Sequence, residues 1–130
     1  VCSPSALEAV ARAGLGYAVS PVFDPELLQA AQAQGLTLVP GVFSPSEVHR
    51  AHRLGCPLVK LFPAASLGPR FWTGLRGPLG GLPPCIAAGG LGVADVLPWL
   101  AAGVDAVALG GQLEGPAAWA ALSDLVRRLG

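Results

Sequence analysis

The sequence has few charged residues, a single lysine and no hydrophobic run long enough to cross a membrane. Only 12% of its 130 residues are charged, whereas 52% are hydrophobic, and the eight acidic residues balance the eight basic ones. This balance argues against binding to nucleic acids or anionic membranes, which depends on an excess of positive charge. No apolar stretch approaches about 18 residues without Gly, Pro or charge, so no membrane-spanning helix is expected. The composition is typical of a tightly packed α/β enzyme.

Metal-binding and disulfide patterns are also missing. Cys2, Cys56 and Cys85 form no CxxC pair and are predicted to be reduced core thiols. His49 and His52 lie three positions apart with no third ligand, so they are interpreted as a solvated helix face, and no metal is expected. No basic and apolar leader precedes a cleavage site, and the protein is therefore expected to be cytoplasmic.

Short apolar runs alternate with amphipathic stretches of about helix length, which is the pattern of βαβ units. Proline and cap residues mark helix starts at Ser3-Pro4 and Asp24-Pro25. Ser44 and Glu47 have the spacing of a capping box, so Glu47 is interpreted as a helix cap and not as a catalytic acid. The pattern predicts six helices and five strands, the strands at residues 17–20, 37–39, 57–62, 85–87 and 106–109.

The number of βα units limits the possible folds. Five units cannot close an eight-stranded barrel, which usually has about 250 residues and at least about 200. Because the chain begins with a helix, we expect a strand in front of it. We therefore predict that residues 1–130 form a single partial domain. This domain is an N-terminally truncated (β/α)8 TIM barrel that contains the C-terminal five-eighths of the complete fold. An open doubly wound sheet is the alternative, but no GxGxxG turn supports a dinucleotide fold. Trp72, Trp99 and Trp119 are expected to pack between helices and barrel.

Lys60 is the only lysine and lies within the apolar run 57–62, which predicts a buried strand. Lysine is seldom buried without a partner or a purpose. Removal from water lowers the pKa of the ammonium group. The neutral amine that results is a nucleophile able to form a Schiff base with a carbonyl substrate. The alternatives are that Lys60 extends to the strand end, or pairs with a carboxylate such as Asp105.

Two glycine pairs follow the last two predicted strands, Gly89-Gly90 and Gly110-Gly111. In β/α barrels the loops after strands seven and eight commonly hold a phosphate, because backbone without side chains lets several N–H groups converge on the anion. Either pair alone would be a weak signal, since glycine pairs are common in turns. Together, in this order, they predict a phosphate site.

Five short segments of the sequence together resemble a known family. The segments 59–64 (VKLFPA), 88–91 (AGGL) and 109–111 (LGG), preceded by 19–21 (VSP) and 39–41 (VPG), are similar to the 2-keto-3-deoxy-6-phosphogluconate (KDPG) aldolase family, which includes the 2-keto-4-hydroxyglutarate and 6-phosphogalactonate aldolases. The likeness runs through the whole chain in order, and the lysine segment is its specific part. It implies a class I aldolase, usually a homotrimer, that cleaves a phosphorylated 2-keto-3-deoxy sugar acid, or 4-hydroxy-2-oxoglutarate, to pyruvate and an aldehyde without a cofactor.

The resemblance also implies residue roles, with Lys60 as the catalytic Schiff-base lysine. The other residues matched to the family's substrate pocket and phosphate loops are Pro21, Phe62, Ala88, Gly89, Gly90, Gly110, Gly111 and Gln112. Two of these depart from the family pattern: Ala88 stands where a threonine is usual, and Gln112 where a serine is usual. The family's acid/base glutamate and carboxylate-binding arginine have no match in this chain.

Two further hypotheses remain open for the function. Without the glutamate and the arginine, the chain could be impaired, or a non-catalytic relic that binds a phosphorylated ligand. A different phosphate-binding barrel enzyme, similar to thiamine-phosphate synthase, would need no Schiff base at all.

A partial barrel is expected to expose a sheet edge and an apolar inner face, so we predict that the 130-residue chain self-associates. Light scattering at increasing protein concentration should show growth in mass. A monodisperse monomer that unfolds cooperatively would contradict this prediction.

Overall fold

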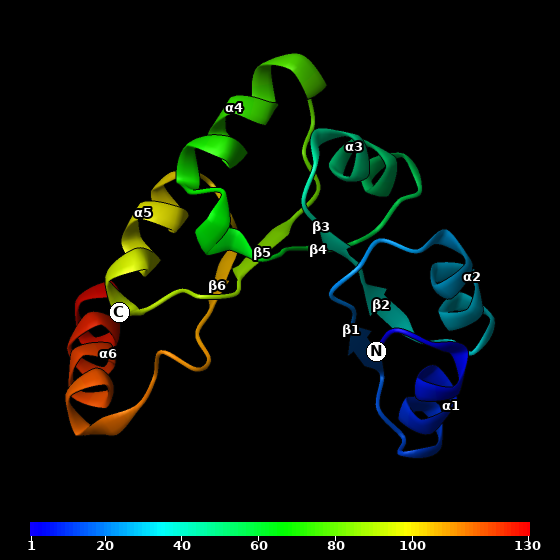
Figure 1. Ribbon diagram of the computed structural model, residues 1–130, viewed down its shortest axis with the longest axis horizontal. Coiled ribbons are helices and arrows are strands. Elements are labelled where there is room, and N and C mark those ends of the chain that lie inside the picture. Colours follow the sequence, from blue (N-terminus) through cyan, green and yellow to red (C-terminus); the bar gives the residue numbers. More distant parts are fainter.

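The computed structural model describes residues 1–130 as an arch, with strands along its inner side and helices along its outer side (Figure 1). No helix is both long enough and apolar enough to span a bilayer. The helices are α1 (Pro4–Arg12), α2 (Pro25–Ala33), α3 (Pro45–Arg53), α4 (Pro69–Leu79), α5 (Val96–Ala101) and α6 (Gly115–Leu129), with short 3-10 helices η1 (Ala64–Ser66) and η2 (Val93–Asp95). The strands are β1 (Tyr17–Val19), β2 (Thr37–Val39), β3 (Gly41–Val42), β4 (Val59–Leu61), β5 (Cys85–Ala88) and β6 (Ala106–Ala108).

All strand pairs are parallel, in the order β1–β2 and β3–β4–β5–β6. The second strand ends at Val39 as predicted, but the short strand β3, which follows Pro40 and pairs with β4, was not predicted. Pro40 has no N–H to donate, yet its carbonyl oxygen accepts a 2.8 Å hydrogen bond from the Lys60 amide. The five predicted strands are therefore present, and β3 is an additional sixth strand.

The predicted helix starts are confirmed. The Ser3 hydroxyl accepts a hydrogen bond from the Ala6 amide, and an Asp24 carboxylate oxygen accepts one from the Glu26 amide at 2.9 Å. Ser44 and Glu47 form a complete capping box, in which the Glu47 carboxylate accepts from the Ser44 amide at 2.9 Å. These caps satisfy helix-start amides that have no partner within the helix, which explains where the chain turns from strand to helix.

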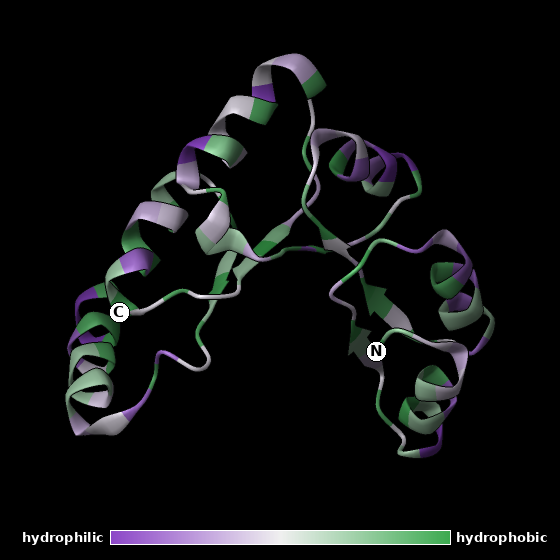
Figure 2. Ribbon diagram, viewed as in Figure 1, coloured by the Kyte–Doolittle hydropathy of each residue, from purple (hydrophilic) through white to green (hydrophobic).

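The helix-facing side of the strands forms the core, and apolar residues follow the strands along the arch (Figure 2). Val59 and Leu61 are fully buried on this side, in a cluster that includes Trp72 and Trp99. A second, smaller cluster lies under α1 and α2. Trp119 does not pack in the core as expected: the residue is 57% exposed, and Leu125 is the only buried residue of α6.

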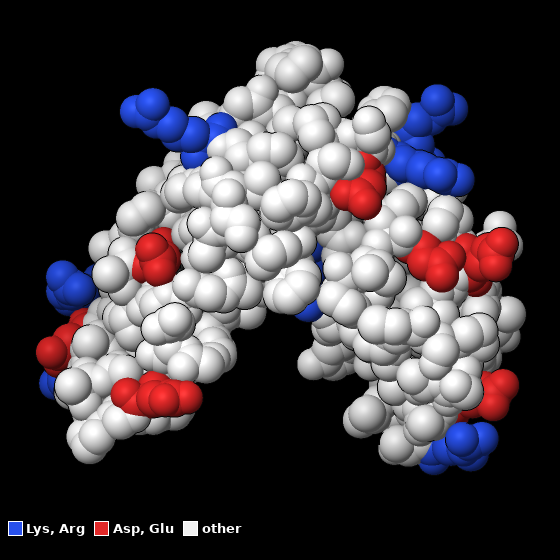
Figure 3. All heavy atoms as spheres, in the orientation of Figure 1, with Lys and Arg blue, Asp and Glu red and all other residues white.

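The opposite side of the strands forms the inner face of the arch and is largely open, as the hollow in Figure 3 shows. Successive side chains alternate across a strand, so Lys60, between Val59 and Leu61, points to this face. Lys60 is half-buried where the sequence predicted burial, because no structure covers the hollow. β1 and β6 each have one unpaired edge.

Gly41 marks a close approach between the backbones of two segments. A Cβ atom there would overlap the carbonyl group of Pro21 and lie 2.9 Å from the Val22 nitrogen. The Gly41 amide donates a hydrogen bond to the Val22 carbonyl oxygen at 3.1 Å, which holds the two backbones together. A side chain at Gly41 would therefore separate the two halves of the sheet.

We predict that Gly41→Ala lowers the free energy of unfolding by roughly 1–3 kcal/mol, the usual cost of overpacking. The matched control is Gly74→Ala in α4, where no atom lies within 4 Å of the new Cβ. That change should raise stability by up to about 1 kcal/mol, because alanine favours the helix. Urea unfolding of both variants measures the difference, and equal midpoints would contradict the packing argument.

Candidate active site

The carboxyl ends of β4, β5 and β6 surround a cavity of about 440 Å³ on the inner face. This volume lies in the range of small-molecule sites. The lining residues are Lys60, Phe62, Ala88, Gly89, Gly90, Leu91, Ala108, Leu109, Gly110, Gly111 and Gln112. The structure thus brings together every predicted site residue except Pro21, whose backbone lies beside Gly41. Leu91, Ala108 and Leu109 were not predicted as site residues, because their side chains have no group that suggests chemistry; Leu91 and Leu109 do lie within the segments that resemble the family.

β4 holds Lys60 in the middle of the sheet. Lys60 is paired in register with Gly41 on β3 and with Ile86 on β5. The amide of Phe62 donates to the Val42 carbonyl oxygen at 3.1 Å, so the backbone on both sides of Leu61 is fixed. This pairing, with Leu61 buried in the core, leaves the lysine side chain only the cavity side.

Lys60 has no carboxylate partner. The ion pairs of the chain are Arg12–Glu8 and Arg127–Asp124, both on helix surfaces. The alternative pairing with Asp105 is wrong: the Asp105 carboxylate instead accepts a 2.8 Å hydrogen bond from the Cys85 amide.

Burial lowers the pKa of the Lys60 ammonium below the ordinary lysine value, and a Coulombic interaction with Cys2 opposes this. Cys2 was expected to be a core thiol, but it is exposed. Nothing in its spacing along the sequence indicated that it would influence Lys60. Cys85, by contrast, is buried on the core side of β5, and burial raises the pKa of its thiol to about 12.

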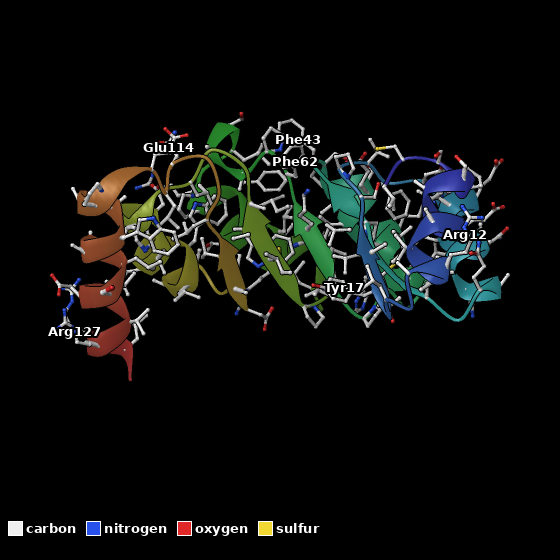
Figure 4. All side chains as sticks on the ribbon, turned by 90° about the horizontal axis from the view of Figure 1, so that it is seen from below. Arg12, Tyr17, Phe43, Phe62, Glu114 and Arg127 are labelled. Atoms are coloured by element: carbon white, nitrogen blue, oxygen red, sulfur yellow. The ribbon has the colours of Figure 1, made fainter.

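Phe62 lies directly beside the amine. The Lys60 Nζ atom is 4.2 Å from the centre of the Phe62 ring, within the range of a cation–π contact. Figure 4 shows Phe62 at the same edge of the arch as Phe43, opposite Tyr17 at the other edge. Because Tyr17 begins β1 and Phe62 follows β4, this edge is the one where the strands end.

The backbone conformation and the packing of the chain require glycine at the first glycine pair but not at the second. Gly89 and Gly90 have positive φ angles of 97° and 75°, which side-chain-bearing residues rarely adopt. A Cβ at Gly89 would lie 2.8 Å from two Phe62 ring carbons, and one at Gly90 would lie 2.9 Å from the Ala65 Cβ. The first pair is therefore required by the fold itself.

Gly110 and Gly111 have no positive φ angle, and a Cβ at either position would meet no atom within 4 Å. The chain turns here, with the Leu113 amide donating to the Gly110 carbonyl oxygen at 2.8 Å. Nothing in the chain requires glycine at this second pair, and its bare backbone borders the cavity.

Polar side chains at the cavity are limited to Lys60 and Gln112, and no carboxylate is among the lining residues. The side chain of Ala88 presents only a methyl group. The cavity can therefore offer one amine, one carboxamide and the backbone amides of the glycine loops. These groups suit addition to a carbonyl and binding of an anionic or polar tail.

Comparison with known proteins identifies the family. The family model described as KDPG and KHG aldolase matches residues 1–127. A probable 2-dehydro-3-deoxy-6-phosphogalactonate aldolase of Rhizobium meliloti is 33% identical over 116 residues, which cover 89% of this chain and 55% of that protein. The 2-dehydro-3-deoxy-phosphogluconate aldolase of Pseudomonas aeruginosa is 35% identical over 102 residues, covering 78% of this chain and 46% of the relative. The chain thus spans about half the length of these curated relatives.

Solved aldolase structures superpose on this chain and support the same family. The native KDPGal structure superposes with a TM-score of 0.83 at 26% identity, covering 98% of this chain and 66% of that one. The Legionella pneumophila KDPG aldolase, in which pyruvate was captured as a covalent carbinolamine, gives 0.78 at 26% identity, covering all of this chain and 66% of that one. A thiamine phosphate pyrophosphorylase from Pyrococcus furiosus shares the fold alone, at a TM-score of 0.70 and 18% identity over 95% of this chain and 65% of that one. On the match to 127 of its residues, this chain belongs to the KDPG and KHG aldolase family.

Proposed function

We propose that Lys60 is the nucleophile of a class I aldolase that cleaves a 2-keto-3-deoxy-6-phospho sugar acid, or 4-hydroxy-2-oxoglutarate, to pyruvate and an aldehyde. The observation that carries the proposal is the placement of the only lysine amine at a cavity beside the strand ends, with a lowered pKa and no carboxylate partner. A neutral amine adds to a carbonyl, whereas an ion-paired ammonium does not. The names of the relatives, and the carbinolamine in the Legionella pneumophila enzyme, support the same chemistry.

In the proposed cleavage the Lys60 amine adds to the 2-keto carbon and water leaves, which forms an iminium ion. Loss of the proton from the C4 hydroxyl breaks the C3–C4 bond, and its electron pair moves into the iminium to give an enamine. The aldehyde departs, the enamine takes a proton at C3, and water releases pyruvate and the free amine. None of the lining residues carries a carboxylate for these proton transfers, which typically contribute about 10²–10⁴-fold. We therefore expect the 130-residue chain to form the imine more readily than it completes the cycle.

The far end of the substrate is assigned to the glycine loops. The bare backbone at Gly110 and Gly111 leaves room for a phosphate to approach, and the Gln112 carboxamide can donate one further hydrogen bond. Gly89 and Gly90 stay candidates for phosphate contact through their amides. Pro21 and Ala88 remain predictions for the pyruvyl end of the pocket.

The wider setting is proposed as well. We expect residues 1–130 to act as part of a barrel domain, in a cytoplasmic protein that is a homotrimer at full length. The expected ligand is a small phosphorylated keto acid, and no metal, cofactor, nucleic acid or membrane is assigned a role.

Incubation with pyruvate and borohydride is predicted to add one pyruvyl unit to the chain, at Lys60. Because burial lowers the pKa of this amine, a larger fraction is neutral at a given pH than for free lysine, and trapping should occur at lower pH than with a lysine model compound. Mass spectrometry of the digested protein locates the adduct.

The matched control is Lys60→Arg, which keeps the charge but cannot form the imine. Failure of the unsubstituted chain to trap pyruvate would overturn the Schiff-base assignment. Turnover that persists in Lys60→Arg would favour a phosphate-binding barrel enzyme of the thiamine-phosphate synthase kind, and retro-aldol cleavage by the chain itself would rule out the relic hypothesis.

Gln112→Ala is predicted to weaken the binding of inorganic phosphate by up to about tenfold, the value of one neutral hydrogen bond. Pyruvate trapping at Lys60 should be unaffected, because the carboxamide serves the other end of the cavity. Gln32→Ala, an exposed glutamine on α2, provides the control. Titration with phosphate, followed by NMR of the backbone amides, measures the effect; equal affinities for both variants would remove Gln112 from the site.

A further inference from the structure

The Phe62 ring lies close to two features of the site. The Lys60 Nζ atom is 4.2 Å from the ring centre. Gly89 lies at the edge of the ring, where a Cβ atom would come within 2.8 Å of two ring carbons. The ring therefore connects the amine to the first glycine loop by direct packing.

We propose that Phe62 is a positioning residue for Lys60, which holds the ammonium, and later the iminium, over its aromatic face, and that Gly89 serves chiefly to seat this ring. The two glycine loops then have different roles. Gly89 in the first loop positions the ring beside the nucleophile, and the second pair leaves backbone free for the ligand.

The physical basis is the charge distribution of an aromatic ring, whose face is negative. The face attracts a cation within about 6 Å, and the attraction strengthens where water is excluded. Burial disfavours the charged form of the amine and lowers its pKa. The ring face stabilises the charged form and so opposes part of this effect. The same face can stabilise the iminium, which remains positively charged after the lysine has reacted.

Few other charged groups surround Lys60. Cys2, from the segment before α1, is the titratable group that acts on it. The neighbouring strands add none on this face, because Gly41 and Ile86 are its register partners, and the Cys85 thiol lies on the core side. A change at the Phe62 ring should therefore appear directly in the titration of the amine.

The contrast between Gly89 and Gly90 provides an internal control. Both have positive φ angles, so alanine would strain the backbone at either position. Only at Gly89 would the new Cβ collide with the Phe62 ring, whereas at Gly90 it would meet Ala65. An effect on Lys60 that is specific to Gly89 therefore reports the position of the ring and not backbone strain.

The experiment uses the fact that Lys60 is the only lysine of the 130-residue chain. Reductive methylation with ¹³C-formaldehyde labels only Lys60 and the N-terminal amine, and Lys60→Arg assigns the two NMR signals. Titration of the Lys60 signal gives the fraction of neutral amine at each pH. Circular dichroism verifies that each variant is folded.

Phe62→Leu should increase the neutral fraction at a fixed pH about two- to fivefold, the factor that corresponds to a partly exposed cation–π contact. Gly89→Ala should act in the same direction. Phe62→Tyr, which keeps an aromatic face, and Gly90→Ala should titrate like the unsubstituted chain. If Phe62→Leu leaves the titration unchanged, or if Gly89→Ala and Gly90→Ala are equivalent, the proposal is overturned.

Fluorinated phenylalanine at position 62 covers the case in which Phe62→Leu does not fold. Fluorine withdraws charge from the ring face while the ring keeps its shape, so a purely structural role predicts no change in the Lys60 titration. A neutral fraction that rises with the number of fluorine atoms supports the proposal, and a constant one refutes it. The importance of this contact for catalysis rests on the proposed function, but the titration requires no substrate, so a failure of pyruvate trapping would be a separate result.

Discussion

Parallel pairing of β4 between β3 and β5 is the constraint on which the rest of the site depends. The backbone bonds on both sides of Lys60 leave its side chain only two directions, toward the helices or toward the inner face. Val59 and Leu61 are fully buried toward the helices, so the lysine must point inward. A shift of one residue in this register would place the amine in the apolar core and two branched side chains in the cavity.

Close backbone approach is the second constraint, and glycine provides it in distinct ways. Gly41 lets the two parts of the sheet meet at Pro21, and Gly89 makes room for the Phe62 ring. At Gly111 no neighbouring atom requires the absence of a side chain, which is why this position is assigned to ligand approach and not to folding. Glycines that look alike in the sequence can thus have separate roles, and the neighbours that a Cβ atom would meet at each position distinguish them.

Much of the fold could be predicted because its signals are local. The Asp24 cap and the Ser44 box act within a few residues, so sequence spacing is enough to locate the helix starts. The short strand β3 after Pro40 was missed, because proline removes a hydrogen-bond donor but its carbonyl oxygen still accepts a bond from Lys60. The prediction that Trp119 packs against the barrel was wrong for a different reason. An apolar stripe on a helix is buried only where another element covers it.

At the site, residue types and their order along the chain are enough to predict the reactive groups: one lysine amine, flanked by apolar residues on a strand, and glycine loops at the ends of the later strands. These follow from residue types and from the period of two along a strand. The surroundings of the amine follow from the folded chain: Cys2 lies near it, Asp105 is hydrogen-bonded to the Cys85 amide, and the Phe62 ring lies 4.2 Å from the Lys60 Nζ atom. Such contacts join residues from separate strands and loops, and their distances depend on how the sheet bends, which no local pattern encodes.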